Sequence, residues 1–289
     1  MEMILNATTT AVSHLLDTRT GDGGWPYYAG DAAGTEPTAL AGLALYAVGQ
    51  TELLPATADW IRGRQRDDGW LTAAATHTEP SWATPLGALL LSVTGDPGSA
   101  GRAAHALLSA NVFAFNPVLA RGIYNYDTLT RGWPWTPDGF SFTEPTALAV
   151  TFLKRFGYGG EPRVPEAARM LRARALPGGG WNYGEPVVLG GELFPTVVPT
   201  ALALLALADE QDDTTAAGLD WLLAQRGQIS TLFSLGWACI ALAALNRLDD
   251  NWRSDLATAW ANAPPARRGP LEAALVVLAL APRETNPLL

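Results

Sequence analysis

The chain has 289 residues, of which 48% are hydrophobic and only 16% charged, and its formal net charge at pH 7 is −9. A chain of this length and composition can bury a large apolar core. Its acidic balance argues against nucleic-acid binding, which needs clustered Lys and Arg, and only one lysine is present.

Other features of the sequence narrow the chemistry. The single cysteine, Cys239, excludes an intrachain disulfide and disfavours a cysteine-based zinc site, and we expect neither a metal nor a cofactor. The acidic run 209–213 could suggest an Asp-rich diphosphate–magnesium motif, but we expect a solvated turn there. The start lacks a secretory signal pattern and no run of about 18 apolar residues occurs, so the expected location is the cytoplasm.

In chain order, the sequence predicts an alternation of amphipathic and wholly apolar helices. A helix that is hydrophobic all round is enclosed by others, whereas one with a polar face lies outside. The predicted outer helices are 2–18, 53–66, 98–111, 163–175, 213–226 and 249–262, and the predicted inner helices are 36–48, 79–93, 144–156, 196–208, 230–246 and 269–281. Antiparallel pairs repeated six times can close into a ring. With no linker visible, we predict one all-α domain, residues 1–289.

A three-part unit recurs along the chain: a Gly-Trp loop, a Thr-Glu-Pro-Thr helix start and an apolar helix. The loops are those at Trp25, Trp70, Trp133 and Trp181, spaced as in a two-helix repeat with variable connections. In each start, the threonine is expected to cap the helix, the glutamate to complement the helix dipole and the proline to fit the first turn. We expect the four tryptophans to be structural.

The same helix starts supply the candidate acids. If the inner helices run parallel, their N-termini gather at one mouth and bring Glu36, Glu79 and Glu144 together. Repulsion and desolvation would then raise the pKa of at least one carboxyl, as a general acid requires. His77 could hydrogen-bond a carboxylate, and Asp127 lies in the long loop 112–142, which is a candidate lid. A purely structural role for each of these residues stays open.

Aromatic side chains follow the Gly-Trp loops and line the long loop. The expected substrate-binding residues are Tyr27, Tyr28, Tyr124, Tyr126, Trp135, Phe142 and Tyr183. Aromatic rings can stabilise a carbocation by about 2 kcal/mol or more each when desolvated. They can equally stack on sugars or fill space, so the aromatic set does not select one ligand.

One segment resembles a known family. Residues 60–70, with Gln65, Gly69 and Trp70, resemble the Gln-Trp repeat of squalene–hopene cyclases, and the loops at Trp25 and Trp181 are similar to degenerate forms in the prenyltransferase and squalene-cyclase repeat superfamily. The resemblance implies an (α/α)6 toroid with a central cavity. Class II terpene cyclases of this group begin an inner helix with Asp-x-Asp-Asp-Thr-Ala, whose middle Asp protonates a polyene. Aligned on Thr-Ala, Glu144 and Glu36 stand at that acid's position, each followed by a proline.

The resulting hypothesis is a terpene cyclase-like enzyme, a lyase or isomerase of terpenoid biosynthesis. A protonated carboxylic acid would cyclise or isomerise an isoprenoid or similar apolar substrate, with Glu144 the preferred acid, Glu36 the second and Glu79 the third. Two alternatives stay open. One is a non-catalytic module that binds a hydrophobic ligand or peptide, for instance within a biosynthetic complex with a protein partner. The other is an (α/α)6 carbohydrate-active enzyme with paired carboxylates.

Overall fold

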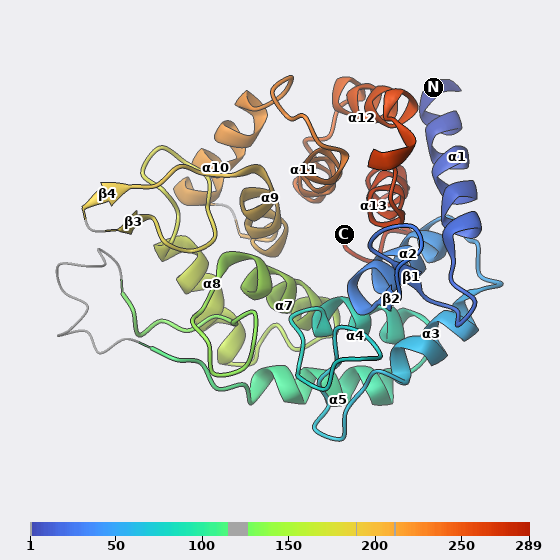
Figure 1. Ribbon diagram of the computed structural model, residues 1–289. Coiled ribbons are helices and arrows are strands. Elements are labelled where there is room, and N and C mark those ends of the chain that lie inside the picture. The colour runs from blue at the N-terminus through green and yellow to red at the C-terminus, as the bar shows by residue number, and fades with distance from the viewer. Residues whose placement is uncertain (1, 115–126, 189, 211) are drawn as a thin grey trace. The chain divides into compact units, whose positions relative to one another are not determined.

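The computed structural model describes residues 2–114, 127–188, 190–210 and 212–289, most of which are helical (Figure 1). Contacts group the chain into two compact units. Unit 1 comprises Met1–Ala106 and Ser230–Leu289, and unit 2 comprises Leu107–Ile229. The predicted organisation as a single domain, 1–289, stays a prediction.

Unit 1 is built around two apolar helices that pack side by side. Its elements are α1 (Glu2–Thr18), β1 (Trp25–Pro26), β2 (Ala33–Gly34), α2 (Thr35–Ala47), α3 (Leu54–Arg62), α4 (Thr84–Val93), most of α5 (Pro97–Leu108), α11 (Leu232–Ala244), α12 (Asp250–Asn262), η1 (Pro265–Arg267) and α13 (Pro270–Leu280). Helix α13 packs against α2, α11 and α1, while α2 also contacts α4 and α3. Strands β1 and β2 form a short antiparallel hairpin directly before α2.

Unit 2 has the same two kinds of helix. Its elements are α7 (Thr143–Arg155), α8 (Arg163–Ala173), β3 (Val187–Val188), β4 (Gly191–Glu192), α9 (Val197–Ala206) and α10 (Asp213–Ala224). Helix α7 packs against α9 and α8, and α10 packs against α9.

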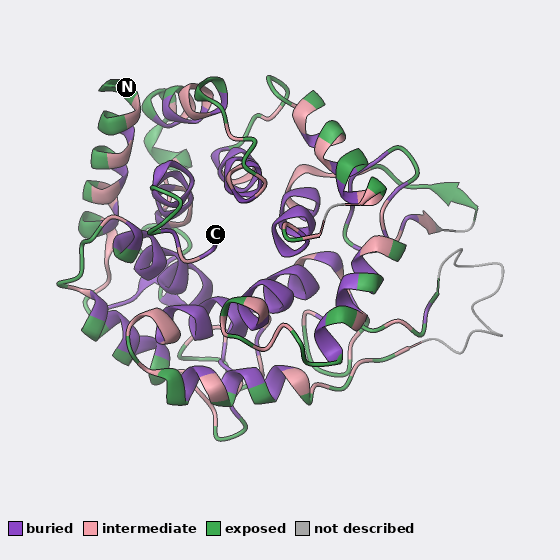
Figure 2. Cartoon of the chain, turned by 180° about the vertical axis from the view of Figure 1, so that it is seen from behind, coloured by how far each residue is buried: buried purple, intermediate pink, exposed green. Residues whose placement is uncertain are grey.

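The predicted alternation of helices is confirmed. Figure 2 shows α2, α4, α7, α9, α11 and α13 buried along nearly their whole length, whereas the intervening helices are exposed along one side. In α2, every residue except Tyr46 is buried. These helices have no polar face because other helices surround them.

One predicted helix start is wrong. The start signal at 78–81 predicts a helix over 79–93, but α4 begins only at Thr84. Instead, Pro80 pairs with Thr72 in an isolated antiparallel bridge, and the amide of Ser81 donates to the carbonyl of Leu71 at 2.8 Å. This pairing holds the backbone extended, so Glu79 lies in the loop and is exposed.

The expected threonine caps are also wrong. Gly34 and Phe142 are the N-cap residues of α2 and α7, and neither helix has a side-chain cap. Thr35 is the first residue of α2, and its hydroxyl donates to the carbonyl of Thr72 at 2.5 Å. The threonine therefore ties its helix to a neighbouring loop of unit 1.

Three buried tryptophans link consecutive elements by one repeated pair of hydrogen bonds. The indole Nε1 of Trp25, Trp133 or Trp181 donates to a carbonyl near the end of a preceding helix, at 2.7, 2.9 and 2.6 Å. The backbone amide of the same residue donates to a threonine hydroxyl in the first turn of the following helix, at 2.8, 2.7 and 2.8 Å. We call these residues the tryptophan anchors. Their predicted structural role follows from this geometry.

In the second repeat the anchor position is not held by Trp70. The amide of Leu71 donates to the hydroxyl of Thr84 at 3.0 Å, 13 residues on, as Trp25 and Trp133 do to their threonines. Leu71 is fully buried, whereas Trp70 is only partly buried. The alignment on Gly-Trp is therefore one residue out of register in this repeat.

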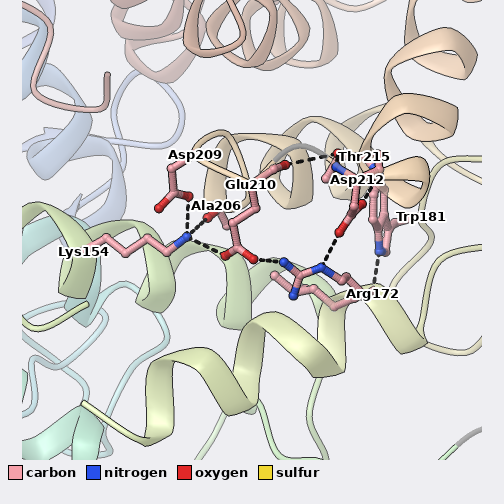
Figure 3. A network of polar contacts seen from close by, with 9 residues as sticks. Lys154, Arg172, Trp181, Ala206, Asp209, Glu210, Asp212 and Thr215 are labelled. Carbon is pink, nitrogen blue, oxygen red and sulfur yellow. Dashed lines mark hydrogen bonds and ion pairs between the residues drawn. The ribbon is translucent and has the colours of Figure 1, made fainter. Parts of the chain in front are cut away.

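The acidic run after α9 forms ion pairs with two other helices (Figure 3). Lys154 of α7 donates to Asp209 at 2.5 Å, to Glu210 at 3.0 Å and to the last carbonyl of α9 at 2.9 Å. Arg172 of α8 pairs with Glu210 and, at 2.6 Å, with Asp212. The expected solvated turn is thus a clamp that joins α7 and α8 to the α9–α10 connection.

Two absences hold for the described part of the chain. None of its helices combines the length and the apolarity needed to cross a bilayer. None of its groups of His, Cys, Asp and Glu is arranged to hold a metal ion.

Candidate functional site

Glu144 lies in the first turn of α7, beside a turn formed by residues 182–185. The amide of Thr143 donates to the carbonyl of Tyr183 at 2.9 Å, which fixes that turn against the helix start. The approach is close: a Cβ added to Gly184 would lie 3.4 Å from the amide nitrogen of Thr143. The side chain of Glu144 is partly buried in this region.

The position of Glu144 favours its neutral form. Burial raises the pKa of Glu144 from its ordinary value of 4.5 to about 7. The N-terminus of a helix favours a negative charge, but here desolvation outweighs that effect. Among the described residues, no hydrogen-bond donor or charge contributes to the shift. Much of Glu144 is therefore protonated at neutral pH, which is the state that a general acid needs.

Two polar side chains that the sequence did not single out hold this region together. Arg174 is only 6% exposed, and its Nη1 donates to the carbonyls of Gly184 at 2.6 Å and Ser141 at 3.3 Å. The Asn182 Oδ1 accepts from the amides of Gly184 and Glu185, at 2.9 and 3.0 Å. From sequence, Arg174 reads as one of several charges on a polar helix face. No local pattern indicates that it reaches the start of another helix.

A cleft in unit 2 borders the same helix start. Its lining includes Phe113, Thr128, Arg131, Phe140, Ser141 and Arg174. Ser141 and Arg174 belong both to this cleft and to the contacts that precede α7. Its volume of about 10 Å³ corresponds to roughly one water molecule, and Glu144 does not line it.

Glu36 has the equivalent place at the start of α2 in unit 1, but different partners. It is 7% exposed, and its Oε2 accepts a hydrogen bond from the hydroxyl of Tyr27 at 2.7 Å. Burial, followed by the negative charge and the hydrogen bond of Glu36, raises the pKa of Tyr27. A donated hydrogen bond favours the ionised carboxylate. Glu36 thus has a hydrogen-bond donor on its carboxyl that Glu144 lacks among the described residues.

The other predicted catalytic residues lie elsewhere. Glu79 is exposed in the loop before α4, so the predicted gathering of three glutamates at helix starts is wrong for this residue. His77 is exposed in the same loop, with its Nδ1 3.3 Å from the hydroxyl of Thr76. Hydrogen bonds from the Thr130 hydroxyl and the Leu129 amide hold the pKa of Asp127 below its usual value. Asp127 is therefore ionised and stabilises a turn.

The predicted aromatic residues differ in exposure. Trp135 and Phe142 are partly buried, while Tyr183 is 56% and Tyr28 73% exposed. Tyr27 belongs to the contact with Glu36 already described. Tyr124 and Tyr126 lie outside the described residues.

The raised pKa of Glu144 predicts a pH-dependent stability. The folded state binds this proton more tightly than the unfolded chain, so the stabilisation is fully present below pH 4.5 and is lost as the pH rises through about 7. We expect Glu144→Gln to raise the free energy of unfolding, relative to wild type, by about 2 kcal/mol more at pH 8 than at pH 5. Urea unfolding at both pH values measures this difference, with the exposed Glu79→Gln as a matched control. An equal effect of Glu144→Gln at the two pH values would contradict the burial of the carboxyl.

The likeness to solved structures places this geometry in a known fold. No protein-family model and no curated protein matches the sequence. A protein from Actinoplanes is similar with 18% identity and a TM-score of 0.63, over 96% of this chain and 98% of the other. Type II terpene cyclase MstE from Scytonema is similar with 17% identity and a TM-score of 0.67, over the full length of both chains.

Another MstE structure, a variant in complex with its substrate geranylgeranyl dihydroxybenzoate, is also 17% identical, with a TM-score of 0.66. At this level of identity the likeness shows the fold alone. The chain has an all-α toroid fold of the type II terpene cyclase kind, as predicted. The fold is not restricted to that reaction, because Rex8A from Paenibacillus barcinonensis, solved with xylose, is similar with 10% identity and a TM-score of 0.59.

Proposed function

We propose that this protein is a terpene cyclase-like enzyme in which Glu144 acts as a general acid on an isoprenoid substrate. The neutral carboxyl would protonate a terminal alkene, and the carbocation that forms would close a ring and then lose a proton. The product would be an isomer of the substrate. The observation that carries this proposal is the partly buried carboxyl of Glu144 in the first turn of α7, without a hydrogen-bond donor among the described residues, in a chain with a type II terpene cyclase-like fold.

The surroundings of Glu144 support this assignment. Phe142 and Tyr183 are the residues that flank the start of α7, and aromatic faces favour a neighbouring cation. We propose an isoprenoid chain as the substrate class, because its alkenes can accept the proton of Glu144.

The other carboxyl groups have less support as the acid. Glu36 accepts a hydrogen bond from Tyr27, which favours the ionised form, and two hydrogen bonds lower the pKa of Asp127. A glycosidase would place a second carboxylate about 5 to 9.5 Å from its acid. Among the described residues, no carboxylate contributes to the raised pKa of Glu144, which favours the single-acid reaction.

Incubation of the purified protein with geranylgeranyl dihydroxybenzoate tests the proposal. We expect a product of unchanged mass with fewer alkene protons, detected by chromatography with mass spectrometry and by proton NMR. Geranylgeranyl diphosphate and a prenylated quinone extend the panel to other head groups. Binding without conversion across this panel would instead favour the non-catalytic module, and binding of xylo-oligosaccharides alone would favour the carbohydrate-active alternative.

A further inference from the structure

The hairpins before α2 and α7 are two copies of one element. Trp25 pairs with Gly34, and Trp133 pairs with Phe142, in the same antiparallel register and with the same number of residues between the partners. Each hairpin begins with Trp-Pro-aromatic and ends directly in Thr-Glu-Pro-Thr-Ala-Leu-Ala, without an insertion or a deletion. Each residue of one hairpin therefore has a structural equivalent in the other.

The two copies share Trp-Pro and differ at the eight positions that follow, of which the first, two residues after the tryptophan anchor, bears on the glutamate. In the first copy this residue is Tyr27, whose hydroxyl donates to Glu36 at 2.7 Å. In the second copy the equivalent residue is Trp135, and the equivalent carboxyl is that of Glu144. Glu144 accepts no hydrogen bond from the described residues, whereas Glu36 does. The same backbone thus presents a glutamate with a phenol donor in one unit and without one in the other.

We propose that Trp135 is a positioning residue for the acid: it occupies the place that Tyr27 has in the first copy and so withholds the hydroxyl that would hold Glu144 as an anion. An indole at this position supplies no hydroxyl to the carboxyl and offers a ring face to a cation, while the proton stays on Glu144. The role of Trp135 in catalysis rests on the proposed function. Its effect on the protonation of Glu144 does not, and can be measured without a substrate.

The charged and titratable groups near the start of α7 do not provide another cause. They are Arg131 and Asp138 on the same hairpin, Arg174 after α8, and Tyr183 and Glu185 in the facing turn. Arg131 is paired with Glu166, and the Nη1 of Arg174 donates to two carbonyls. Burial alone raises the pKa of Glu144, without a contribution from any of these charges. The test therefore varies the side chain at position 135, with or without a hydroxyl that could donate to Glu144.

The test compares Trp135→Tyr with Trp135→Phe. With glutamate labelled by 13C at the δ-carboxyl, NMR titration follows each carboxyl, and the signal that disappears in Glu144→Gln identifies Glu144. We expect Trp135→Tyr to lower the titration midpoint of Glu144 by about one pH unit or more, whereas Trp135→Phe lowers it little. The reciprocal variant, Tyr27→Phe, removes only the hydroxyl and should raise the midpoint of Glu36, which keeps the test available if changes at Trp135 disturb folding.

Equal midpoints for Glu144 in Trp135→Tyr and Trp135→Phe would overturn the inference, and so would an unchanged Glu36 in Tyr27→Phe. Turnover provides a second readout. The pH at which activity falls should move down with the Glu144 midpoint in Trp135→Tyr, leaving activity at pH 7 about 5-fold lower for a shift of one unit, while Trp135→Phe retains the wild-type pH profile. Full activity of Glu144→Gln would defeat the proposed function without altering the titration result, so the two failures can be told apart.

Discussion

Replacement of Glu144 by glutamine is expected to lower turnover of an isoprenoid substrate by about 100-fold or more, because general acids contribute roughly 10²–10⁴-fold. Glutamine keeps the shape of the side chain but cannot supply the proton. Protonation of an unactivated alkene is demanding, and burial raises the pKa of Glu144 towards the range that this step needs. Initial rates with geranylgeranyl dihydroxybenzoate, measured from pH 5 to pH 9, provide the comparison. Wild-type activity should fall as the pH rises through about 7, where Glu144 loses its proton.

Three variants control this experiment. Glu79→Gln alters an exposed loop residue and should leave turnover unchanged. Glu36→Gln removes a carboxyl that accepts a hydrogen bond from Tyr27, so its effect should be smaller than that of Glu144→Gln and should not remove the fall in activity near pH 7. Glu144→Asp keeps a carboxyl at a shorter reach and should retain part of the activity. If Glu144→Gln keeps more than half of the wild-type rate, this residue is not the acid.

Most of the fold could be predicted because the apolar composition of the inner helices shows that they are buried on all sides. The run from Ala39 to Leu45 has no polar residue, and a helix without a polar face has to be enclosed. The bounds of α2, α7 and α9 accordingly lie within one or two residues of the prediction. The start of α4 could not be predicted in the same way, because Thr78-Glu79-Pro80-Ser81 has the local signature of a helix start. The pairing of Pro80 with Thr72 overrides that signature, and a local pattern does not show such a contact.

The candidate acid could be named from sequence, but the burial that raises its pKa could not. Resemblance to the cyclase motif and the repeated Thr-Glu-Pro-Thr treat Glu36 and Glu144 alike. They differ in hydrogen bonding: Glu36 accepts from Tyr27, nine positions upstream, and the residue at the equivalent position before Glu144 is Trp135, which has no hydroxyl. The burial of Glu144 further depends on the 182–185 turn, about 40 residues away along the chain. The hydrogen bonding and the burial of these glutamates depend on tertiary contacts. An alignment of the repeats shows which residues are equivalent only when the pairing register of the hairpins is known.

In the second repeat, too, a local sequence motif does not identify the structurally equivalent residue. Alignment on the Gly-Trp pair equates Trp70 with Trp25, but the glycine with a positive φ is the better marker. Gly23 and Gly69, with φ of 98° and 91°, each stand two residues before the buried anchor position. At Gly69 a Cβ would lie 2.4 Å from the carbonyl oxygen of Arg102, so only glycine fits there. Counted from this glycine, Leu71 rather than Trp70 is the equivalent of Trp25.

Truncation of the anchor residues is expected to have the largest effect on stability. Trp25→Ala should lower the free energy of unfolding by about 4 kcal/mol, since burial of a tryptophan is worth roughly 3–5 kcal/mol and a helix-end carbonyl loses its donor as well. Leu71→Ala should cost about 2–3 kcal/mol, because Leu71 is fully buried at the same position. Trp70→Ala should cost less than about 1 kcal/mol, because Trp70 is only partly buried and is not an anchor.

All three substitutions lie in unit 1, so urea unfolding followed by far-UV circular dichroism compares them on one structural unit. Circular dichroism avoids the change in fluorescence that loss of a tryptophan causes. Trp25→Phe is the matched control: it keeps most of the buried area but removes the indole N–H that donates to the carbonyl of Leu15 at 2.7 Å, so its cost isolates the hydrogen bond. The order Trp25, then Leu71, then Trp70 follows from the register set by the glycines. A larger loss of unfolding free energy for Trp70→Ala than for Leu71→Ala would favour the simple Gly-Trp alignment. Leu71 would then not be the equivalent of Trp25.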